Sequence, residues 1–171
     1  EPEVPDGEAV PGLLRARLGS AGRPRAAMGY GAAARLVFGE SDGLPGLVAD
    51  RYGDAVVFQL LCAGTEALRE QLVGMLGEAF GASLVVERSD TGNREREGLQ
   101  PARGVRSGTL PAGGLVPFSE GGLELVADVL DGQKTGFYLD QRDNWMALRP
   151  LARGRRVLDV CCYTGAFGLS M

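Results

Sequence analysis

Histidine is absent from the 171 residues, and this absence excludes several kinds of site from the chain. A zinc site with histidine ligands, a Ser–His triad and a Cys–His pair all require an imidazole. Long apolar runs are absent as well: the longest, such as residues 55–63, fall far short of the ~20 residues that a membrane span needs. The sequence therefore predicts a chain without a metal centre or a membrane segment.

Cysteine is scarce, with only Cys62, Cys161 and Cys162. A secreted disulfide scaffold needs a denser and even set, and a vicinal pair alone is a poor chelating geometry. The three cysteines lie in apolar runs, which is typical of buried free thiols in a reducing compartment. We expect a cytoplasmic protein with three unpaired cysteines.

The charge balance is slightly acidic, with 18 basic and 22 acidic residues and a net charge of −4. This balance argues against a chain that acts as a whole as an electrostatic clamp on nucleic acid. The polar loop expected at residues 89–113 carries arginines, but glutamates alternate with them, as is usual in a solvated loop. Strong affinity for phosphates is therefore not expected from this chain alone.

Proline, glycine, alanine and arginine dominate residues 1–33, which predicts a linker with one short helical piece near residues 13–18. Residues 34–131 then read as an α+β central domain, an antiparallel, strand-rich unit with one helix in a β-β-β-α-β-β order. Thr65 is the expected N-cap of that helix, whose apolar residues recur at i, i+4, i+7 and i+8 up to Ala79.

The last forty residues differ in pattern. A helix is expected to begin at the capping residue Asp140 and to stop at Pro150. An apolar strand at residues 156–162 and a glycine-bearing turn at residues 163–168 lead into another helix. Strand, glycine turn and helix form the opening half of a doubly wound unit. We therefore expect residues 132–171 to hold the first strand and helix start of a Rossmann-like α/β domain.

The glycine turn indicates a ligand class. Gly165 and Gly168 allow close approach of the backbone, and Asp159 stands where such sheets bind ligands. The pattern is neither G-x-G-x-x-G nor a P-loop, which disfavours phosphate-bearing cofactors. A cofactor with an ammonium and a carboxylate but no phosphate fits better, and S-adenosylmethionine is such a molecule. A merely structural glycine turn is the alternative.

Three sequence blocks carry a family resemblance. Residues 40–53 (ESDGLPGLVADRYG), residues 134–142 (KTGFYLDQR) and residues 157–168, with their VLD and YTGAFG segments, are similar in order to blocks of the class I S-adenosylmethionine-dependent 23S rRNA methyltransferases of the cytosine-5 type. The resemblance runs from about Arg35 to the end of the chain.

This resemblance implies an architecture of three domains. An RNA-binding PUA domain would precede residues 1–33, which would then be a helical connector; residues 34–131 would be the central domain, and residues 132–171 the start of a truncated methyltransferase domain. The chain is then expected to be an internal fragment, inactive by itself. Its partner would be 23S rRNA, contacted mainly through the missing parts, and the oligomeric state stays open, with a homodimer as one option.

The resemblance also implies site residues. Those assigned to S-adenosylmethionine are Phe137, Gln141, Arg142, Asp159, Tyr163, Thr164, Gly165 and Phe167. Arg142 could pair with the cofactor carboxylate, or it could be a solvated helix charge. No catalytic residue is expected: the family's nucleophilic cysteine lies in a motif later than Met171, and Cys161 and Cys162 are assigned packing or pocket-lining roles.

The expected activity is methyl transfer from S-adenosylmethionine to large-subunit rRNA, at cytosine carbon 5. The alternatives are a guanine-N7 rRNA methyltransferase on the same scaffold, which needs no cysteine nucleophile, and a non-catalytic fragment that orients RNA. Because a parallel-sheet strand is normally covered on both faces, the segment after Asp131 is expected to be exposed or poorly packed in this chain.

Overall fold

The computed structural model describes residues 9–171, so the part of the expected linker at residues 1–8 lies outside the described residues. The strands are β1 (Ala33–Phe38), β2 (Leu47–Tyr52), β3 (Ala55–Leu60), β4 (Leu84–Ser89), β5 (Ala102–Ser107), β6 (Leu115–Glu120) and β7 (Leu123–Asp128). The α-helices are α1 (Ala9–Ala27), α2 (Ala63–Ala67), α3 (Arg69–Phe80), α4 (Arg142–Ala152) and α5 (Ala166–Ser170), and short 3-10 helices lie at Gly39–Asp42, Gly92–Glu97, Ala112–Gly114 and Leu139–Gln141.

The first five strands form one sheet in the order β1-β2-β3-β4-β5. All neighbours are antiparallel except β3 and β4, which are parallel because α2 and α3 carry the chain back across the sheet. The sheet is therefore mixed, and the purely antiparallel arrangement expected from the sequence is wrong at this pair. Strands β6 and β7 form a separate antiparallel hairpin.

The loop expected at residues 89–113 is wrong in part, because strand β5 lies within it. This strand pairs antiparallel with β4 at the edge of the sheet, with Gly104 opposite Glu87 and Arg103 opposite Arg88. Most of its side chains are exposed, so no apolar alternation marks it in the sequence. Edge strands rich in charge are common because charge discourages pairing with other sheets.

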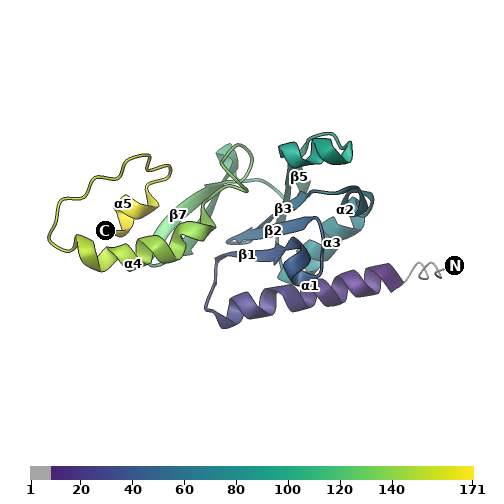
Figure 1. The fold of residues 1–171 in the computed structure, drawn as a ribbon, viewed down its shortest axis with the longest axis horizontal. Helices are drawn as coiled ribbons and strands as arrows, with labels where there is room; N and C mark the ends of the chain where they lie inside the picture. The colour runs from purple at the N-terminus through teal and green to yellow at the C-terminus, as the bar shows by residue number, and fades with distance from the viewer. Residues whose placement is uncertain (1–8) are drawn as a thin grey trace.

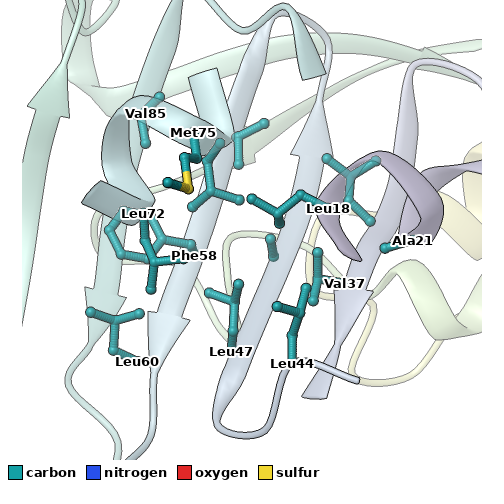
Figure 2. Packing of buried hydrophobic residues seen from close by; sticks show 14 residues of the cluster. Leu18, Ala21, Val37, Leu44, Leu47, Phe58, Leu60, Leu72, Met75 and Val85 are labelled. Carbon is teal, nitrogen blue, oxygen red and sulfur yellow. The ribbon is translucent and has the colours of Figure 1, made fainter. Parts of the chain in front are cut away.

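Helices α1 and α3 cover one face of the sheet (Figure 1). Leu18 of α1 is fully buried and lies in one cluster with Phe58 of β3 and Leu72 of α3 (Figure 2). The helix is 19 residues long, so residues 9–27 are not the loosely structured linker that their proline and glycine content predicts. Packing against the sheet overrides that composition, because tertiary contacts supply most of a helix's stability.

The apolar stripe of the second helical segment is confirmed, since Leu72 and Leu76 of α3 are buried. Its start differs from the prediction: Thr65 lies inside α2, which follows Cys62, and the non-helical Leu68 separates α2 from α3. The Thr65 hydroxyl donates to carbonyls at Gly46 and Cys62 and thus caps no helix.

The β6–β7 hairpin, α4 and α5 form a second core on the opposite face of the sheet. Phe137 and Trp145 are buried there, so residues 132–152 are better packed than expected for the segment after Asp131. By contrast, Leu158 and Val160 are 85% and 73% exposed, as that expectation requires. Residues 156–162 form no strand in the described chain, because no neighbouring strand offers them hydrogen bonds.

Helix α4 differs from its prediction at both ends. It continues through Pro150 to Ala152, since one missing hydrogen bond in the last turn is tolerated. Asp140 does not cap it; this residue belongs to the preceding 3-10 helix, and its carboxylate accepts a hydrogen bond from Lys134 Nζ at 2.6 Å.

Arg25 of α1 donates two hydrogen bonds to Asp42 of the 3-10 helix Gly39–Asp42. This anchor of α1 predicts that the stability of the fold depends on pH. Burial alone would raise the pKa of Asp42, but hydrogen bonds from Arg25 and from the Phe38 amide outweigh it and lower this pKa. A lowered folded-state pKa stabilises the fold above the unfolded value of ~3.9, and this contribution is lost as pH falls through the folded value. Urea unfolding between pH 6 and 3 should therefore show a steeper loss of stability for wild type than for Asp42→Asn. The exposed Asp131, substituted as Asp131→Asn, is the control; equal slopes for wild type and Asp42→Asn would contradict the anchor.

The β6–β7 turn predicts a difference between two adjacent glycines. Both have positive φ, but a Cβ on Gly121 would lie 2.4 Å from the ring of Trp145, whereas a Cβ on Gly122 would meet nothing within 4 Å. Both alanine substitutions should cost roughly 1 kcal/mol for the left-handed backbone. Gly121→Ala should cost about 1–3 kcal/mol more, because the fully buried ring must move. Thermal unfolding of Gly121→Ala and Gly122→Ala measures this difference, and equal midpoints would refute the close packing.

Candidate functional site

A cavity of about 820 Å³ lies between the segment 133–141, α4 and the turn before α5. Its volume is within the usual range of sites for small molecules and cofactors. The lining residues are Gln133, Phe137, Tyr138, Asp140, Gln141, Trp145, Cys161, Cys162, Tyr163, Thr164, Ala166 and Phe167. Five of them are aromatic, so the walls are largely flat and apolar with a few polar groups between.

The inner wall of this cavity is anchored in the second core. Phe137 makes an edge-on contact with Phe118 of β6, with ring centroids 5.1 Å apart. Phe118 in turn packs on Tyr52 of β2 at 5.6 Å. Trp145, the single tryptophan of the chain, is fully buried beside them. Aromatic contacts of this kind hold the wall in one position.

On one side of the cavity, hydrogen bonds connect two segments that are far apart in the sequence. The hydroxyl of Tyr163 accepts a hydrogen bond from the Gln133 amide and donates one to the Gly136 carbonyl, both at 3.2 Å. The rings of Tyr138 and Tyr163 meet edge to face, with centroids 5.3 Å apart. The glycine turn is therefore tied to the segment 133–138.

The other side of that segment is held by the sheet. Asp50 of β2 is 1% exposed and accepts two hydrogen bonds from Arg35 of β1, at 2.8 and 2.9 Å. Thr135 donates to the same carboxylate at 2.6 Å. Because the Thr135 proton goes to Asp50, the single proton of the Tyr52 hydroxyl is shared between Thr135 Oγ1 at 2.8 Å and the Phe137 carbonyl oxygen at 3.3 Å. Burial, reinforced by the nearby Asp50 charge, raises the pKa of Tyr52, so its hydroxyl stays protonated.

The turn before α5 contains backbone conformations that L-residues rarely adopt. Cys161 and Tyr163 have φ values of 64° and 51°, and Gly165, the N-cap residue of α5, has a φ of 81°. Each such non-glycine residue costs roughly 1–2 kcal/mol, and strain of this kind clusters at ligand sites. The Asp159 carboxylate stabilises the turn by accepting a hydrogen bond from the Gly168 amide at 3.0 Å.

The structure brings together five of the eight residues assigned to the cofactor from the sequence. The five that line the cavity are Phe137, Gln141, Tyr163, Thr164 and Phe167. Asp159 and Gly165 shape the turn behind the cavity without lining it. Arg142 also lies outside its lining.

Arg142 has partners of its own. Its Nε lies 2.9 Å from a Glu120 carboxylate oxygen, as an ion pair without good hydrogen-bond angles, and its guanidinium lies 4.5 Å from the ring centre of Tyr30. It lines a second cavity of about 410 Å³ against β1 and β2. It is therefore neither a freely solvated helix charge nor part of the first cavity.

Several lining residues were missed from the sequence. Tyr138 and Asp140 belong to the same sequence block, residues 134–142, as Phe137 and Gln141. Membership in this block could therefore have identified them as lining residues. Trp145 follows Gln141 by four positions, which places the two on one helical face. The hydrogen bond from Lys134 lowers the pKa of Asp140 and thus keeps a negative charge at the rim.

The cysteines only partly match their prediction. Cys161 and Cys162 line the cavity, as the pocket-lining role requires, but both are exposed rather than buried. Cys62 is half-buried at the start of α2. All three are free thiols.

Two features are absent from residues 9–171, the part of the chain that the structure describes. Among these residues, no three histidine, cysteine or acidic side chains are grouped so that they could hold a metal ion. No helix within this range has both the length and the apolar character needed to cross a membrane.

Sequence comparison relates the chain to rRNA methyltransferases. It is 47% identical over 135 residues to the ribosomal RNA large subunit methyltransferase I of Shewanella denitrificans, and 48% identical over 136 residues to the protein of that name from Yersinia pseudotuberculosis. These matches cover 79% and 80% of the chain but only 34% of each relative. The chain thus spans about a third of the length of these relatives. No family model matches it.

Comparison with solved structures shows a shared fold. A proposed SAM-dependent methyltransferase from Streptococcus mutans superposes with a TM-score of 0.75 at 22% identity, over 94% of this chain and 41% of that protein. A second structure, of a proposed methyltransferase complexed with SAH, gives a TM-score of 0.76 over the same shares. The fold described here is therefore the fold of part of those proteins.

The two hydrogen bonds of Tyr163 predict how the cavity wall responds to substitution. Tyr163→Phe keeps the ring contact with Tyr138 but removes the hydroxyl, at a cost of about 1 kcal/mol or more of stability. Amide hydrogen exchange at Gln133 should accelerate, since its acceptor is lost. Tyr30→Phe is the matched control, because the Tyr30 hydroxyl makes only one long, exposed hydrogen bond to Asp143 at 3.3 Å. Unchanged exchange at Gln133 would show that the hydroxyl does not hold the wall.

Proposed function

We propose that this chain is part of an S-adenosylmethionine-dependent methyltransferase that acts on large-subunit rRNA, and that the 820 Å³ cavity takes the cofactor. One observation carries the proposal. Phe137 and Gln141 come from one sequence block and Tyr163, Thr164 and Phe167 from another, yet all five surround one cavity. The names of the relatives, at 47–48% identity, supply the substrate class.

The residues of the cavity fit the chemistry of this cofactor. Its adenine ring suits flat aromatic walls such as Phe137, Tyr138 and Phe167. Its ammonium and sulfonium groups are cations, and Asp140 offers an ionised carboxylate at the rim. Gln141 and Thr164 supply neutral polar groups for hydrogen bonds. When bound, the cofactor would supply the transferable methyl group.

We propose the following domain organisation for the protein. Residues 1–33 are a connector after a PUA domain, residues 34–131 the central domain, and residues 132–171 the start of the methyltransferase domain. The exposed Val157, Leu158 and Val160 support the last assignment, because a strand inside a parallel sheet buries such side chains. The connector includes α1, which packs on the central sheet.

We propose cytosine carbon 5 as the acceptor atom. Methylation there requires a thiolate that adds to carbon 6 and makes carbon 5 nucleophilic. Cys161 and Cys162 lie in the cofactor turn, so we place this nucleophile in a part of the protein outside the chain. The alternatives are guanine N7 as acceptor, which needs no thiolate, and a non-catalytic role in orienting RNA.

Binding of S-adenosylhomocysteine to the full-length protein that carries this sequence tests the cofactor site. Isothermal titration should detect binding, and Phe167→Ala should weaken it about tenfold, since an aromatic contact contributes about 1.5 kcal/mol beyond its buried area. Leu169→Ala is the matched control: Leu169 lies two residues on in α5, is 63% exposed and does not line the cavity. No binding by wild type, or equal loss in both variants, would refute the assignment of this cavity.

Methylation of 23S rRNA by the same protein tests the reaction and the acceptor atom. Mass spectrometry of the modified nucleotide should identify 5-methylcytosine, and replacing each cysteine in turn with alanine should abolish transfer at one cysteine outside residues 1–171. Activity retained in every cysteine variant, with 7-methylguanine as product, would favour the alternative acceptor. Cofactor binding without any rRNA methylation would favour the non-catalytic role.

A further inference from the structure

The segment 133–138 forms the shared wall between the sheet and the candidate cofactor cavity. Gln133, Phe137 and Tyr138 line that cavity. Thr135 lies between them in sequence but faces the opposite way, into the core, where it is 1% exposed. The buried Thr135 thus connects this wall to the five-stranded sheet, beside the contact of the Tyr52 hydroxyl with the Phe137 carbonyl.

The backbone of this segment has little regular structure to hold it. It belongs to no helix or strand before the 3-10 helix at Leu139, and Lys134 and Gly136 have φ values of 56° and 135°. Conformations of this kind persist only where surrounding contacts over-determine them. The position of the wall must therefore depend on specific side-chain contacts.

The contacts of Thr135 are strong and lead to a rigid element. Its hydroxyl donates to the Asp50 carboxylate at 2.6 Å, a bond to an ionised acceptor in a site from which water is excluded. Asp50 lies opposite Arg35 in the register of β1 and β2, and the Arg35 guanidinium donates two hydrogen bonds to the Asp50 carboxylate. The carboxylate is therefore held by a residue of the sheet as well as by Thr135.

We propose that Asp50, acting through Thr135, is a positioning residue for the cofactor cavity. The proposal rests on the proposed function, because it assumes that the cavity takes S-adenosylmethionine. Without the Thr135 hydroxyl, only a fraction of the molecules hold Gln133, Phe137 and Tyr138 in place. The apparent dissociation constant for the cofactor then rises by the inverse of that fraction.

Titration of the full-length protein with S-adenosylhomocysteine tests this proposal. Thr135→Val removes the hydroxyl at nearly constant volume and should weaken binding about tenfold, the factor expected for one lost hydrogen bond to a charged group. Thr135→Ser keeps the hydroxyl and should retain most of the affinity. Asp50→Asn should weaken binding in the same direction, since it disturbs the carboxylate that receives both Arg35 and Thr135.

Two matched controls separate positioning from general destabilisation. Thr65→Val removes a threonine hydroxyl that also makes hydrogen bonds, but in α2, outside the residues that line the cavity. Glu87→Gln alters a fully buried carboxylate of β4 that is paired with Arg106 of β5, in the same sheet but outside the residues that line the cavity. Both controls should lower the unfolding temperature and leave the affinity for S-adenosylhomocysteine unchanged. Wild-type affinity in Thr135→Val, or equal losses in the controls, would overturn the proposal.

A second readout does not depend on the cofactor. The Gly136 amide donates to the Gln133 carbonyl and the Gln133 amide donates to the Tyr163 hydroxyl. Hydrogen exchange of both amides should accelerate in Thr135→Val and Asp50→Asn but not in the two controls. Exchange that accelerates in a protein without affinity for S-adenosylhomocysteine would refute the proposed function and leave the link to the wall intact. Binding by wild type with unchanged exchange in Thr135→Val would refute the link alone.

Discussion

The arrangement of this molecule depends on the hydrogen bonds that the buried Asp50 carboxylate accepts. This carboxylate lies on the face of the sheet that carries the second core and accepts hydrogen bonds from Arg35 of the neighbouring strand and from Thr135, 85 residues later in the sequence. A buried charge is tolerated only when it is fully paired, so these three groups must come together as the chain folds. The same contact that satisfies the charge joins the central sheet to the segment 133–138, which supplies three of the twelve residues that line the candidate cofactor cavity.

The two apolar clusters on either side of the sheet explain why the site lies where it does. On one face, α1 and α3 pack on the sheet and form the first core. On the other face the β6–β7 hairpin, Phe137 and Trp145 form a second core, and the cavity opens at its outer margin. The glycine turn reaches this margin through Tyr163, which places the residues of the candidate site at the junction of two structural units. Junctions of this kind are common positions for ligand sites.

Much of this could be predicted from the sequence, and the failures have identifiable causes. The strands at Leu47–Tyr52 and Ala55–Leu60 and the buried stripe of α3 follow from apolar periodicity alone. Helix α1 was expected only as a short helical piece near residues 13–18, and strand β5 was missed, because packing and pairing stabilise them against their composition. The cavity residues Phe137 and Tyr163 were found by resemblance. The roles of Asp50 and Arg35 were not, because a pair formed across two strands has no signature in either segment.

Strand β5 leaves one end of the sheet open along its backbone. Its Arg103 and Arg106 side chains stand on that edge, held there by Asp131 and Glu87. Positive charges beside unpaired amides and carbonyls make it unfavourable for another strand to add to the sheet. A composition typical of a polar loop is therefore also that of a charged edge strand, and the arginines that hide the strand from sequence analysis disfavour the addition of another strand at this edge.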